Sequence, residues 1–278
     1  MARPPESRTP ALPLRLATWN INSVRLRLPL VERFLAAHKP DILVLQEIKC
    51  QNDQFPAEAL AKAGYRHQAV NGQKGYHGVA IVSRLPISDI AIRPFCRKDD
   101  SRHISAVVKA PGTTFRLHNF YIPAGGDEPD PKINEKFRHK LDFLGELEDW
   151  FDDRLFDKGQ VIAGDFNIAP HENDVWSHKQ LLKVVSHTPV ETEWLDRIRD
   201  RRKWSDLVRQ KIPYADKVYS WWSYRAHDWD ASDRGRRLDH VWSTRDVAPA
   251  AKKVEVIREA RGWGDKPSDH VPVIVTLG

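Results

Sequence analysis

Carboxylate and amide side chains follow short apolar runs at several places in this 278-residue sequence. In LATWNIN, Asn20 and Asn22 share one face of a strand while Ile21 points the other way, because side chains alternate across a strand. In DILVLQEIK, four apolar residues lead to Gln46 and Glu47. A carboxylate at the end of a buried strand is costly unless it is paired or bound to a metal. These strand ends are therefore candidate functional positions.

Three further places in the second half of the chain repeat this pattern. In VIAGDFN, Asp165 and Asn167 again share a strand face, and in PSDHVPVIV the pair Asp269 and His270 precedes the last apolar run. RRLDHVWS adds Asp239 at the start or middle of another apolar run. Each residue alone has a plainer explanation. An Asp at a strand end more often caps a helix or forms a turn, and a lone His before a strand is usually solvated.

These scattered residues become informative if the fold brings them together. Ligands of open α/β sheets bind beyond the strand ends, so residues that end several strands can meet in one site. The set offers oxygen ligands and an imidazole but no thiolate cluster, a choice that favours Mg²⁺ or Mn²⁺ over zinc. An imidazole beside a carboxylate has a fixed tautomer and a raised pKa, which suits a general base acting on water. Together these groups indicate metal-assisted phosphoryl transfer.

Eight apolar runs are predicted to be the strands that position these residues, at 14–18, 42–45, 79–82, 104–109, 115–121, 161–163, 238–241 and 271–275. Helices are predicted at 26–38, 131–155 and 190–199. In the second helix, apolar residues from Ile133 to Leu155 recur at intervals of three or four, with Pro131 in the first turn. Strands with interspersed helices and no break in composition predict one α/β domain with two packed sheets.

Composition narrows the class of protein. The chain is 41% hydrophobic, enough for a full core, so a disordered or fibrous protein is excluded. No apolar run approaches the roughly 18 residues that span a bilayer, so no membrane association is expected. The net charge of +6 is compatible with a polyanionic partner but does not identify one. Cys50 and Cys96 have no metal-like spacing and are expected to be reduced thiols of a cytoplasmic protein.

The first 13 residues, MARPPESRTPALP, differ from the rest of the chain. They contain four prolines and lack the apolar segment of a secretory signal. We expect residues 1–13 to be a disordered tail, because a short proline-rich segment cannot bury enough surface to become ordered. Residues 14–278 are expected to form a single domain.

Eight motifs occur in the order found in the exonuclease III family of abasic-site endonucleases. They are WNINSVR, LQEIKC, GQKGYHGVAIVS, NFYIPAGG, GDFNIAP, SWWSYR, RRLDHVWS and PSDHVPV. Any one of them is weak, but eight in order over nearly the whole chain are highly specific. The sequence thus resembles this family, within the endonuclease/exonuclease/phosphatase superfamily. The resemblance implies a four-layer α/β sandwich, in which two packed mixed β-sheets are flanked by helices.

The resemblance also implies an activity. The expected enzyme uses Mg²⁺, with Mn²⁺ as a plausible substitute, and cleaves the DNA phosphodiester 5′ to an abasic site. It is also expected to have 3′→5′ exonuclease and 3′-phosphatase activity. Its partner is then double-stranded DNA with abasic sites or blocked 3′ ends, and it is expected to act as a monomer.

Roles for individual residues follow from the matching motifs. Glu47 matches the family's metal carboxylate and Asn20 lies beside it, while Asp165, Asn167 and Asp269 complete the expected metal set. Asp165 also matches the residue that orients or deprotonates water, and Asn167 the amide that steadies developing negative charge. A metal, an amide and a charged imidazole help most where a phosphodiester attack builds charge on the non-bridging oxygens.

Three other residues complete the expected catalytic set. Asp239 matches the residue that positions the active-site network, and His270 the imidazole on the scissile phosphate or water. Tyr121 matches a tyrosine whose hydroxyl contacts the phosphate and can help the leaving oxygen. Which residue acts as the general base stays open. The sequence departs from its relatives at Ala124, where many carry Asn or Gln, and at Asn22, where some carry Asp.

Two of the ten tryptophans, Trp221 and Trp222, are adjacent and lie near Trp229. They could simply pack in the core, but in an alternating strand only one of two neighbours can face it. In the family, aromatic residues here line the pocket for the flipped-out abasic sugar, which costs little to extrude because it has no base to unstack. Trp221 and Trp222 are therefore predicted to bind substrate. The following tryptophans are interpreted as structural: Trp19, Trp150, Trp176, Trp194 and Trp204.

Three basic residues are predicted to contact DNA. Arg25 closes the WNINSVR motif, and Lys74 lies in the glycine-rich loop GQKGYHG, which can approach a nucleic-acid backbone closely. Arg102 matches a family arginine that reaches duplex DNA. Such contacts fix the position of the duplex without reading its sequence.

Two alternatives to the nuclease remain open from the sequence. The first is another phosphodiesterase of the superfamily, acting on phospholipids or non-specifically on nucleic acid. The second is a non-catalytic DNA-binding scaffold on the same fold. The complete set of candidate catalytic residues argues against the scaffold, because a degenerate protein has no reason to keep all of them.

Overall fold

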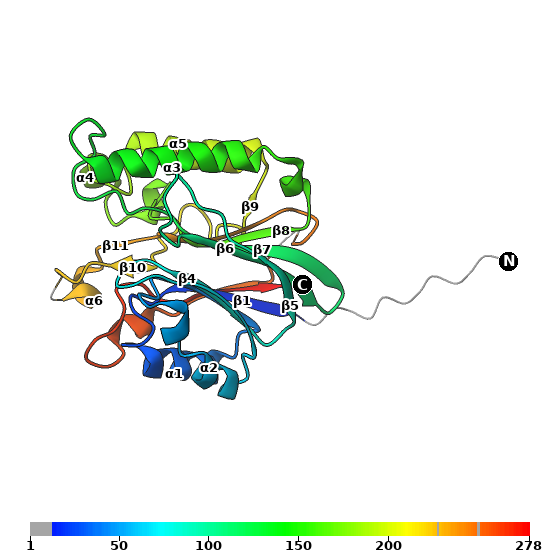
Figure 1. The fold of residues 1–278 in the computed structure, drawn as a ribbon. Helices are drawn as coiled ribbons and strands as arrows, with labels where there is room; N and C mark the ends of the chain where they lie inside the picture. The colour runs from blue at the N-terminus through cyan, green and yellow to red at the C-terminus, as the bar shows by residue number, and fades with distance from the viewer. Residues whose placement is uncertain (1–12, 227, 249–250) are drawn as a thin grey trace.

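The computed structural model describes residues 13–278 except 227 and 249–250. Two six-stranded sheets pack face to face, and helices cover both outer faces (Figure 1). The predicted four-layer α/β sandwich is therefore confirmed. The predicted disordered tail falls, apart from Pro13, outside the described residues. No helix in the described part of the chain is long and apolar enough to cross a membrane.

The first sheet has the strand order β13-β14-β1-β2-β4-β3. In that order its strands are Lys253–Val256, Val273–Leu277, Leu14–Asn20, Ile42–Gln46, Val79–Ser83 and His67–Asn71. Strands β1 and β2 are parallel, and the other neighbours are antiparallel, so the sheet is mixed. Strand β2 is buried along its whole length, because the second sheet covers one face and helices cover the other.

The second sheet has the strand order β5-β6-β7-β8-β12-β9. In that order its strands are Ile87–Ala91, His103–Ala110, Thr113–Tyr121, Gln160–Asp165, Asp239–Ser243 and Ser205–Asp206. A separate two-stranded ribbon joins β10 (Trp221–Trp222) to β11 (Gly235–Arg236). Apolar side chains of both sheets fill the space between them, among them Leu16, Val44 and Leu117. Burial of this kind stabilises a fold by about 25 cal/mol per Å² of apolar surface.

The helices form the outer layers. Below the first sheet in Figure 1 lie α1 (Leu28–His38) and α2 (Ala57–Lys62), and above the second lie α3 (Glu135–Phe151) and α5 (Pro189–Arg201). The shorter elements are α4 (His178–Leu181), α6 (Trp229–Ser232) and the 3₁₀ turns Asn52–Gln54, Arg154–Asp157, Glu172–Asp174 and Arg258–Gly262. A capping box at Thr188 and Glu191 starts α5, with Pro189 in its first turn.

The helix predicted at 131–155 is shorter than expected. It starts after Asn134, whose side chain accepts a hydrogen bond from the Lys136 N–H, and it ends at Phe151. Pro131 and Ile133 therefore precede the helix, and Ile133 is 75% exposed. Leu155 lies in the following 3₁₀ turn and is 64% exposed. Apolar residues recur at helical spacing before Asn134 as well as after it. The helix nevertheless begins after Asn134, because the side chain of Asn134 caps it there.

All eight predicted strands are present, and they are the eight inner strands of the two sheets. The strands that the sequence pattern missed include the four edge strands, β3, β5, β9 and β13. Strand β5 shows why, because four of its five residues are exposed and its sequence ISDIA has no continuous apolar run. An edge strand is covered on fewer sides, so burial does not force its sequence to be apolar.

Candidate active site

The candidate residues meet at one end of the sandwich, where strands of both sheets terminate. Strand β1 ends at Asn20, β7 at Tyr121 and β8 at Asp165. Strand β12 runs antiparallel to β8 and starts at Asp239, which pairs with Asp165 across the ladder. The chain reaches His270 just before β14, and a β-bridge joins it to Trp221. The antiparallel register therefore brings the start of one strand beside the end of another.

Two buried carboxylates and an imidazole form the centre of the cluster. Nδ1 of His270 lies 2.8 Å from Oδ2 of Asp239, and its Nε2 lies 3.6 Å from Oδ2 of Asp165. All three residues are at least 96% buried. One ligand atom from each lies within 4.8 Å of the others. The hydrogen bond that Nδ1 of His270 donates to Asp239 fixes the ring, so that Nε2 faces Asp165.

Asn20 connects this centre to Glu47 on the other sheet. Its amide Nδ2 donates to Oδ2 of Asp165 at 2.9 Å and to Oε1 of Glu47 at 3.0 Å. Its oxygen accepts the backbone N–H of Asn22. In this arrangement the Asn20 oxygen points away from the carboxylates. The predicted metal ligand Asn20 thus holds two carboxylates in position through its nitrogen.

Glu47 also contacts Tyr121 and Lys49. The hydroxyl of Tyr121 donates to Oε1 of Glu47 at 2.8 Å, and Nζ of Lys49 lies 2.8 Å from Oε2. Burial opposes ionisation of Glu47, but Lys49 and these hydrogen bonds together lower its pKa. Burial, followed by Glu47 and Asp165, raises the pKa of Tyr121 well above its usual range. Tyr121 is therefore a neutral phenol that carries a proton.

The central groups have strongly perturbed proton affinities. Burial opposes the charge of His270, but Asp239 and Asp165 raise its pKa to about 10. Burial raises the pKa of Asp165 to about 7, against the effect of His270 and with the help of Asp239. His270 is therefore a cation at neutral pH, and Asp165 exchanges its proton near neutrality. Such shifts in a cavity are typical of groups that handle protons or bind metals.

Three site residues have a backbone that is unfavourable for non-glycine residues. Asn22, Glu47 and Asn167 have φ angles of 48°, 49° and 54°. Asn167 is held there because its Nδ2 donates to the carbonyl of Ile122 and to Asp165, and its N–H donates to the other oxygen of Asp165. Backbone strain of this kind collects at functional sites, where the surrounding structure enforces it.

The donors of the cluster fit a divalent cation. Asp239 Oδ1 is buried and has no hydrogen-bond partner among the described residues, which leaves an oxygen available. Asp269, predicted as a ligand, is half-buried and accepts from Nδ2 of Asn22 and from Nε1 of Trp221. Oxygen-rich donors of this type suit Mg²⁺ and Mn²⁺. Several carboxylates this close repel one another unless a cation neutralises them.

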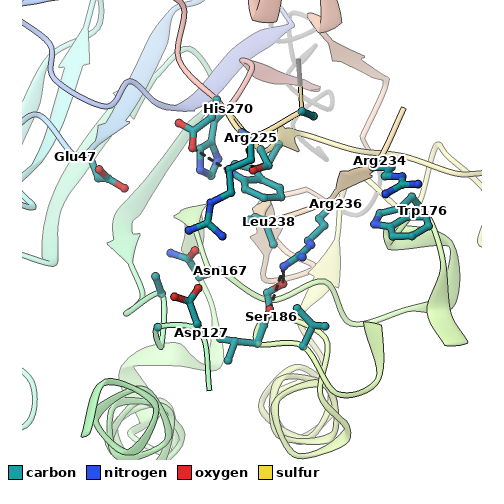
Figure 2. A pocket seen from close by; sticks show the side chains of 18 of the residues that line it. Glu47, Asp127, Asn167, Trp176, Ser186, Arg225, Arg234, Arg236, Leu238 and His270 are labelled. Carbon is teal, nitrogen blue, oxygen red and sulfur yellow. Dashed lines mark hydrogen bonds between the residues drawn. The ribbon is translucent and has the colours of Figure 1, made fainter. Parts of the chain in front are cut away.

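A cavity of about 660 Å³ opens from the cluster. Its lining includes three of the five predicted catalytic residues, Tyr121, Asn167 and His270, together with Glu47 and Asp269. Figure 2 labels Glu47, Asn167 and His270 around it. The rest of the lining includes Trp176, Val184, Val185, Ser186, Trp221, Arg234, Arg236 and Leu238. The site thus joins an acidic end to a wall of aromatic and basic side chains.

Comparison with known proteins agrees with this geometry. A model of the Endonuclease/Exonuclease/phosphatase family matches residues 17–270. The chain belongs to this family. It is 30% identical to exodeoxyribonuclease III of Haemophilus influenzae over 94% of this chain and 98% of that relative.

Two solved structures have the same fold. The 3′ phosphatase NExo from Neisseria, bound to a product DNA hairpin, superimposes with a TM-score of 0.85 and 34% identity. An AP endonuclease from Archaeoglobus fulgidus gives a TM-score of 0.85 and 30% identity. Each comparison covers 95% of this chain and 99% of the other chain.

The structure separates the two tryptophans that were predicted to bind substrate. Trp221 lines the cavity, whereas Trp222 is 2% exposed and packs in the core under the first sheet. Its indole Nε1 donates to Asp233 rather than facing the cavity. The prediction for Trp222 is corrected accordingly, because a strand alternates its side chains and only one of the pair can face the cavity.

A second correction concerns Trp176. The sequence predicts a structural role for this residue, but it lines the same cavity as Trp221. Its backbone N–H donates to the carbonyl of Gly235, which attaches the segment after Asp174 to the ribbon. Trp176 is far from the SWWSYR motif in the sequence. Only the tertiary structure shows that Trp176 and Trp221 line the same cavity.

The three predicted DNA contacts have different environments. Arg25 and Lys74 are exposed, and their contact with DNA stays a prediction. Arg102 is only 9% exposed, and its guanidinium bonds Asp100, the Tyr121 carbonyl and the ring of His77. Its position supports Tyr121 from behind, so the structure does not present Arg102 as a surface DNA contact. The burial of Arg102 is the reason, and the sequence alone does not show that burial.

The two departures from the family pattern also have defined positions. Ala124 lines the cavity and supplies no side-chain hydrogen bond, while its carbonyl accepts from Lys140. Asn22 bonds Asp269 through Nδ2 and accepts from Lys49 through Oδ1 at 2.6 Å. Asn22 therefore links the Asp269 side of the site to the lysine that pairs with Glu47.

Several residues that shape the site carry no clear signal in the sequence motifs. Arg225, Arg234 and Arg236 line the cavity, and the first two are exposed. Lys140 is fully buried beneath it and donates to the carbonyl of Asn167 at 2.8 Å, while pairing with Glu191. A lysine inside the apolar stripe of a predicted helix was an available signal, because lysine is almost never fully buried unless it is paired.

Proposed function

We propose that this protein is a divalent-metal-dependent DNA repair nuclease that cleaves the phosphodiester 5′ to abasic sites. It also acts on 3′ termini, as a 3′→5′ exonuclease and a 3′-phosphatase. The observation that carries the proposal is the buried Asp165–His270–Asp239 cluster beside a cavity whose lining also includes aromatic and basic side chains. The acidic cluster suits the chemistry of a phosphodiester, and the aromatic and basic lining suits the nucleotide attached to it.

The cavity fits an extruded nucleotide that has lost its base. Trp221 and Leu238 supply an apolar surface for a sugar, and Trp176 extends that surface. Extruding such a nucleotide costs little because it has no base to unstack. The exposed Arg25 and Lys74 are the proposed phosphate contacts that hold the duplex without reading its sequence. These contacts predict an affinity that falls as salt rises, because binding releases counterions.

The protein groups that would act on the phosphate face one another. His270, held by Asp239, presents a charged Nε2 that stabilises negative charge on the non-bridging oxygens. Asn167 lines the same cavity, and its Nδ2 donates to the carbonyl of Ile122 and to Oδ2 of Asp165. Tyr121 keeps its proton and can donate it to a phosphate oxygen or to the leaving 3′ oxygen.

The proton of the attacking water needs an acceptor. Although burial opposes its charge, Asp239 and Asp165 raise the pKa of His270 to about 10, which favours its charged form over a role as the base. Asp165 has a pKa near 7 and lies at the centre of the cluster, so we assign the proton to Asp165. This assignment places the base 3.6 Å from Nε2 of His270, the stabilising cation.

The residues that would hold the cation are Glu47, Asp165 and Asp269. Oδ1 of Asp239, which has no hydrogen-bond partner in the described chain, lies in the same cluster as Asp165. When bound, a divalent cation supplies Lewis-acid stabilisation of the phosphoryl charge. Mg²⁺ is the proposed ion and Mn²⁺ a plausible substitute, because both prefer oxygen donors.

The relatives support this choice over the alternatives. They are named as an exodeoxyribonuclease, a 3′ phosphatase bound to a product DNA hairpin, and an AP endonuclease. None of these names points to a phospholipid substrate or to a non-catalytic scaffold. A monomeric state and a cytoplasmic location remain predictions from the sequence.

The test is incision of a labelled duplex that carries one abasic-site analogue. With Mg²⁺ we expect a single cut 5′ to the lesion, leaving a 3′-hydroxyl, and no cut with EDTA. An undamaged duplex of the same sequence is the control. Random cleavage of both duplexes would support a non-specific nuclease, and no cleavage of either, with DNA binding retained, would support the scaffold.

A further inference from the structure

Arg236 occupies an unusual position in the cavity wall. The ribbon of β10 and β11 pairs it directly with Trp221, and its guanidinium lies 5.1 Å from the centre of the Trp221 ring. Nη1 donates to the carbonyl of Val185 at 3.0 Å and to the hydroxyl of Ser186 at 2.8 Å, as Figure 2 shows for Ser186. The side chain is therefore fixed in place as part of the wall.

This fixed cation has no carboxylate partner among the described residues. Its Nε is buried and makes no hydrogen bond within the described part of the chain. The adjacent Arg237 is the contrast, because it is fully enclosed and pairs with both Asp174 and Asp206. A half-buried guanidinium costs desolvation energy, and burial lowers the pKa of Arg236 although the nearby Glu191 opposes this. Nε is out of reach of solvent, but the side chain lines the cavity, so an anion bound there would supply the missing ion-pair partner.

The cation lies within reach of a group attached to the scissile phosphate. A β-bridge joins His270 to Trp221, and the ribbon joins Trp221 to Arg236. Neighbouring strands are about 4.8 Å apart, so the backbones of His270 and Arg236 are separated by roughly 10 Å. All three side chains line one cavity. A short substituent on a phosphate held at His270 would therefore extend toward Arg236.

The surroundings strengthen the positive field at this end. Arg234 stacks on Trp176 at 4.8 Å, and Arg225 projects into the same space (Figure 2). No ion pair of either arginine is found within the described residues. The cavity's own carboxylates are Glu47 and Asp269 in the cluster and Asp127 beside Asn167. The wall around Arg236 is therefore basic while the catalytic end is acidic.

We propose that Arg236 makes the enzyme selective for charge. It favours a 3′-blocking group that carries a carboxylate beyond the scissile phosphate over a neutral group of the same size. This inference rests on the proposed function, because it needs a phosphodiester held at His270 and Asp165. The reaction itself is unchanged: water bonds to phosphorus, the bond from phosphorus to the 3′ oxygen breaks, and that oxygen takes a proton.

A purely structural role for Arg236 makes a different prediction. If the guanidinium only ties Val185 and Ser186 to the ribbon, its loss should impair charged and neutral substrates equally. If it binds an anion, its loss should impair the charged substrate selectively. A hydrogen bond between two ionised groups is strong enough to give about tenfold discrimination or more.

The test uses two recessed duplexes that differ in one group. One carries a 3′-phosphoglycolate and the other a 3′-(2-hydroxyethyl) phosphate, which replaces the carboxylate by a neutral alcohol of similar size. For the wild-type enzyme with Mg²⁺, we expect kcat/KM to be about tenfold or more higher for the glycolate. A ratio near one would overturn the proposal.

The variants separate charge from structure. Arg236→Met keeps an apolar stem over Trp221 and should bring the ratio close to one, with the neutral substrate changed only a few-fold. Arg236→Lys should keep part of the preference. Arg245→Met removes the same charge beyond the far end of β12, where the residue is exposed, and should leave the ratio unchanged. An unaltered ratio in Arg236→Met would overturn the assignment.

Two further measurements keep the test decisive. If Arg236→Met fails to fold, inhibition of the wild-type enzyme by free phosphoglycolate and by 2-hydroxyethyl phosphate replaces it, and equal inhibition would contradict the proposal. Incision of a duplex with a neutral abasic analogue tests the proposed function separately. Normal incision without charge preference would reject only the role of Arg236, whereas no cleavage of any substrate would reject the nuclease itself.

Discussion

Two buried aspartates, nine residues apart in the chain, have opposite electrostatic surroundings. Asp174 is fully buried and contacts Arg237 and Arg209, with Nε of Arg237 at 2.7 Å and Nη2 of Arg209 at 2.5 Å. Although burial opposes its charge, these guanidiniums lower the pKa of Asp174. Asp165 is equally buried but lies beside other carboxylates, and its pKa is raised.

The difference distinguishes a structural acid from a functional one. Arg237 and Arg209 neutralise Asp174 permanently, so that cluster is complete as folded. The Asp165 cluster has His270 as its central cation, shared between two acids, and an oxygen of Asp239 without a partner in the described chain. A buried acid that the protein leaves incompletely neutralised suits a cation from outside, whereas a fully paired one does not.

The largest effect is expected for Asp165→Asn. Cleavage of the abasic duplex should fall by about 10³-fold or more, on the order of 4 kcal/mol of barrier, because the proton acceptor and a metal ligand are both lost. Stability without metal should be equal or higher, since one of several crowded acids is removed. Single-turnover cleavage and urea unfolding measure the two quantities. Cleavage within tenfold of wild type would contradict the comparison.

The matched change, Asp174→Asn, should lower stability and leave cleavage almost unchanged. Asp174→Asn leaves Arg237 and Arg209 without their main partner and should lower the free energy of unfolding by about 3 kcal/mol or more. The folded fraction should keep a cleavage rate within a few-fold of wild type. Urea unfolding and cleavage rates corrected for the folded fraction measure this. A stable but inactive variant would show that the two clusters do not differ as described.

The sequence predicted the acids of the site but not their state of pairing. Asp165 and Asp174 both follow the β8 run, and only the turns of the chain bring Arg209 and Arg237 to the second of them. Alternation predicted that Asn20, Asp165 and Asn167 would face one side of their strands. It could not predict that Asn20 bonds through its nitrogen, because that depends on where Glu47 and Asp165 converge.

The fold was predictable where burial constrains the residues. The inner strands read as continuous apolar runs because both of their faces are covered. Edge strands such as β5 and β13, and the two-residue strands of the ribbon, have no such signature. The ribbon is the element that brings Trp221 beside Arg236, so the wall of the cavity was the part of the site least accessible from sequence.

A smaller effect tests on a histidine whether neighbouring charges decide the protonation of a buried group. His118 is buried beside His103 and Gln160 rather than beside acids, and burial lowers its pKa to about 3. Below pH 6.5 the unfolded chain binds a proton that the folded His118 does not, so stability falls as pH falls from 6.5 toward 3. Between pH 7 and 5 this costs about 2 kcal/mol.

His118→Gln should therefore lose less stability than wild type over that range, by about 2 kcal/mol. Urea unfolding of both proteins at pH 7 and pH 5, without metal, gives the difference. If both proteins lose the same free energy of unfolding, burial without acidic neighbours does not keep His118 neutral. That result would contradict the view that neighbouring charges decide the protonation of a buried group.

The most direct test of the central claim is binding of Mn²⁺, followed by electron paramagnetic resonance, in wild type, Asp165→Asn and Asp174→Asn. Unfolding is monitored in parallel so that only folded protein is compared. The incompletely neutralised cluster should bind the ion in wild type and in Asp174→Asn, and at least about tenfold more weakly in Asp165→Asn. Equal affinity in wild type and Asp165→Asn would contradict a metal centre at this cluster.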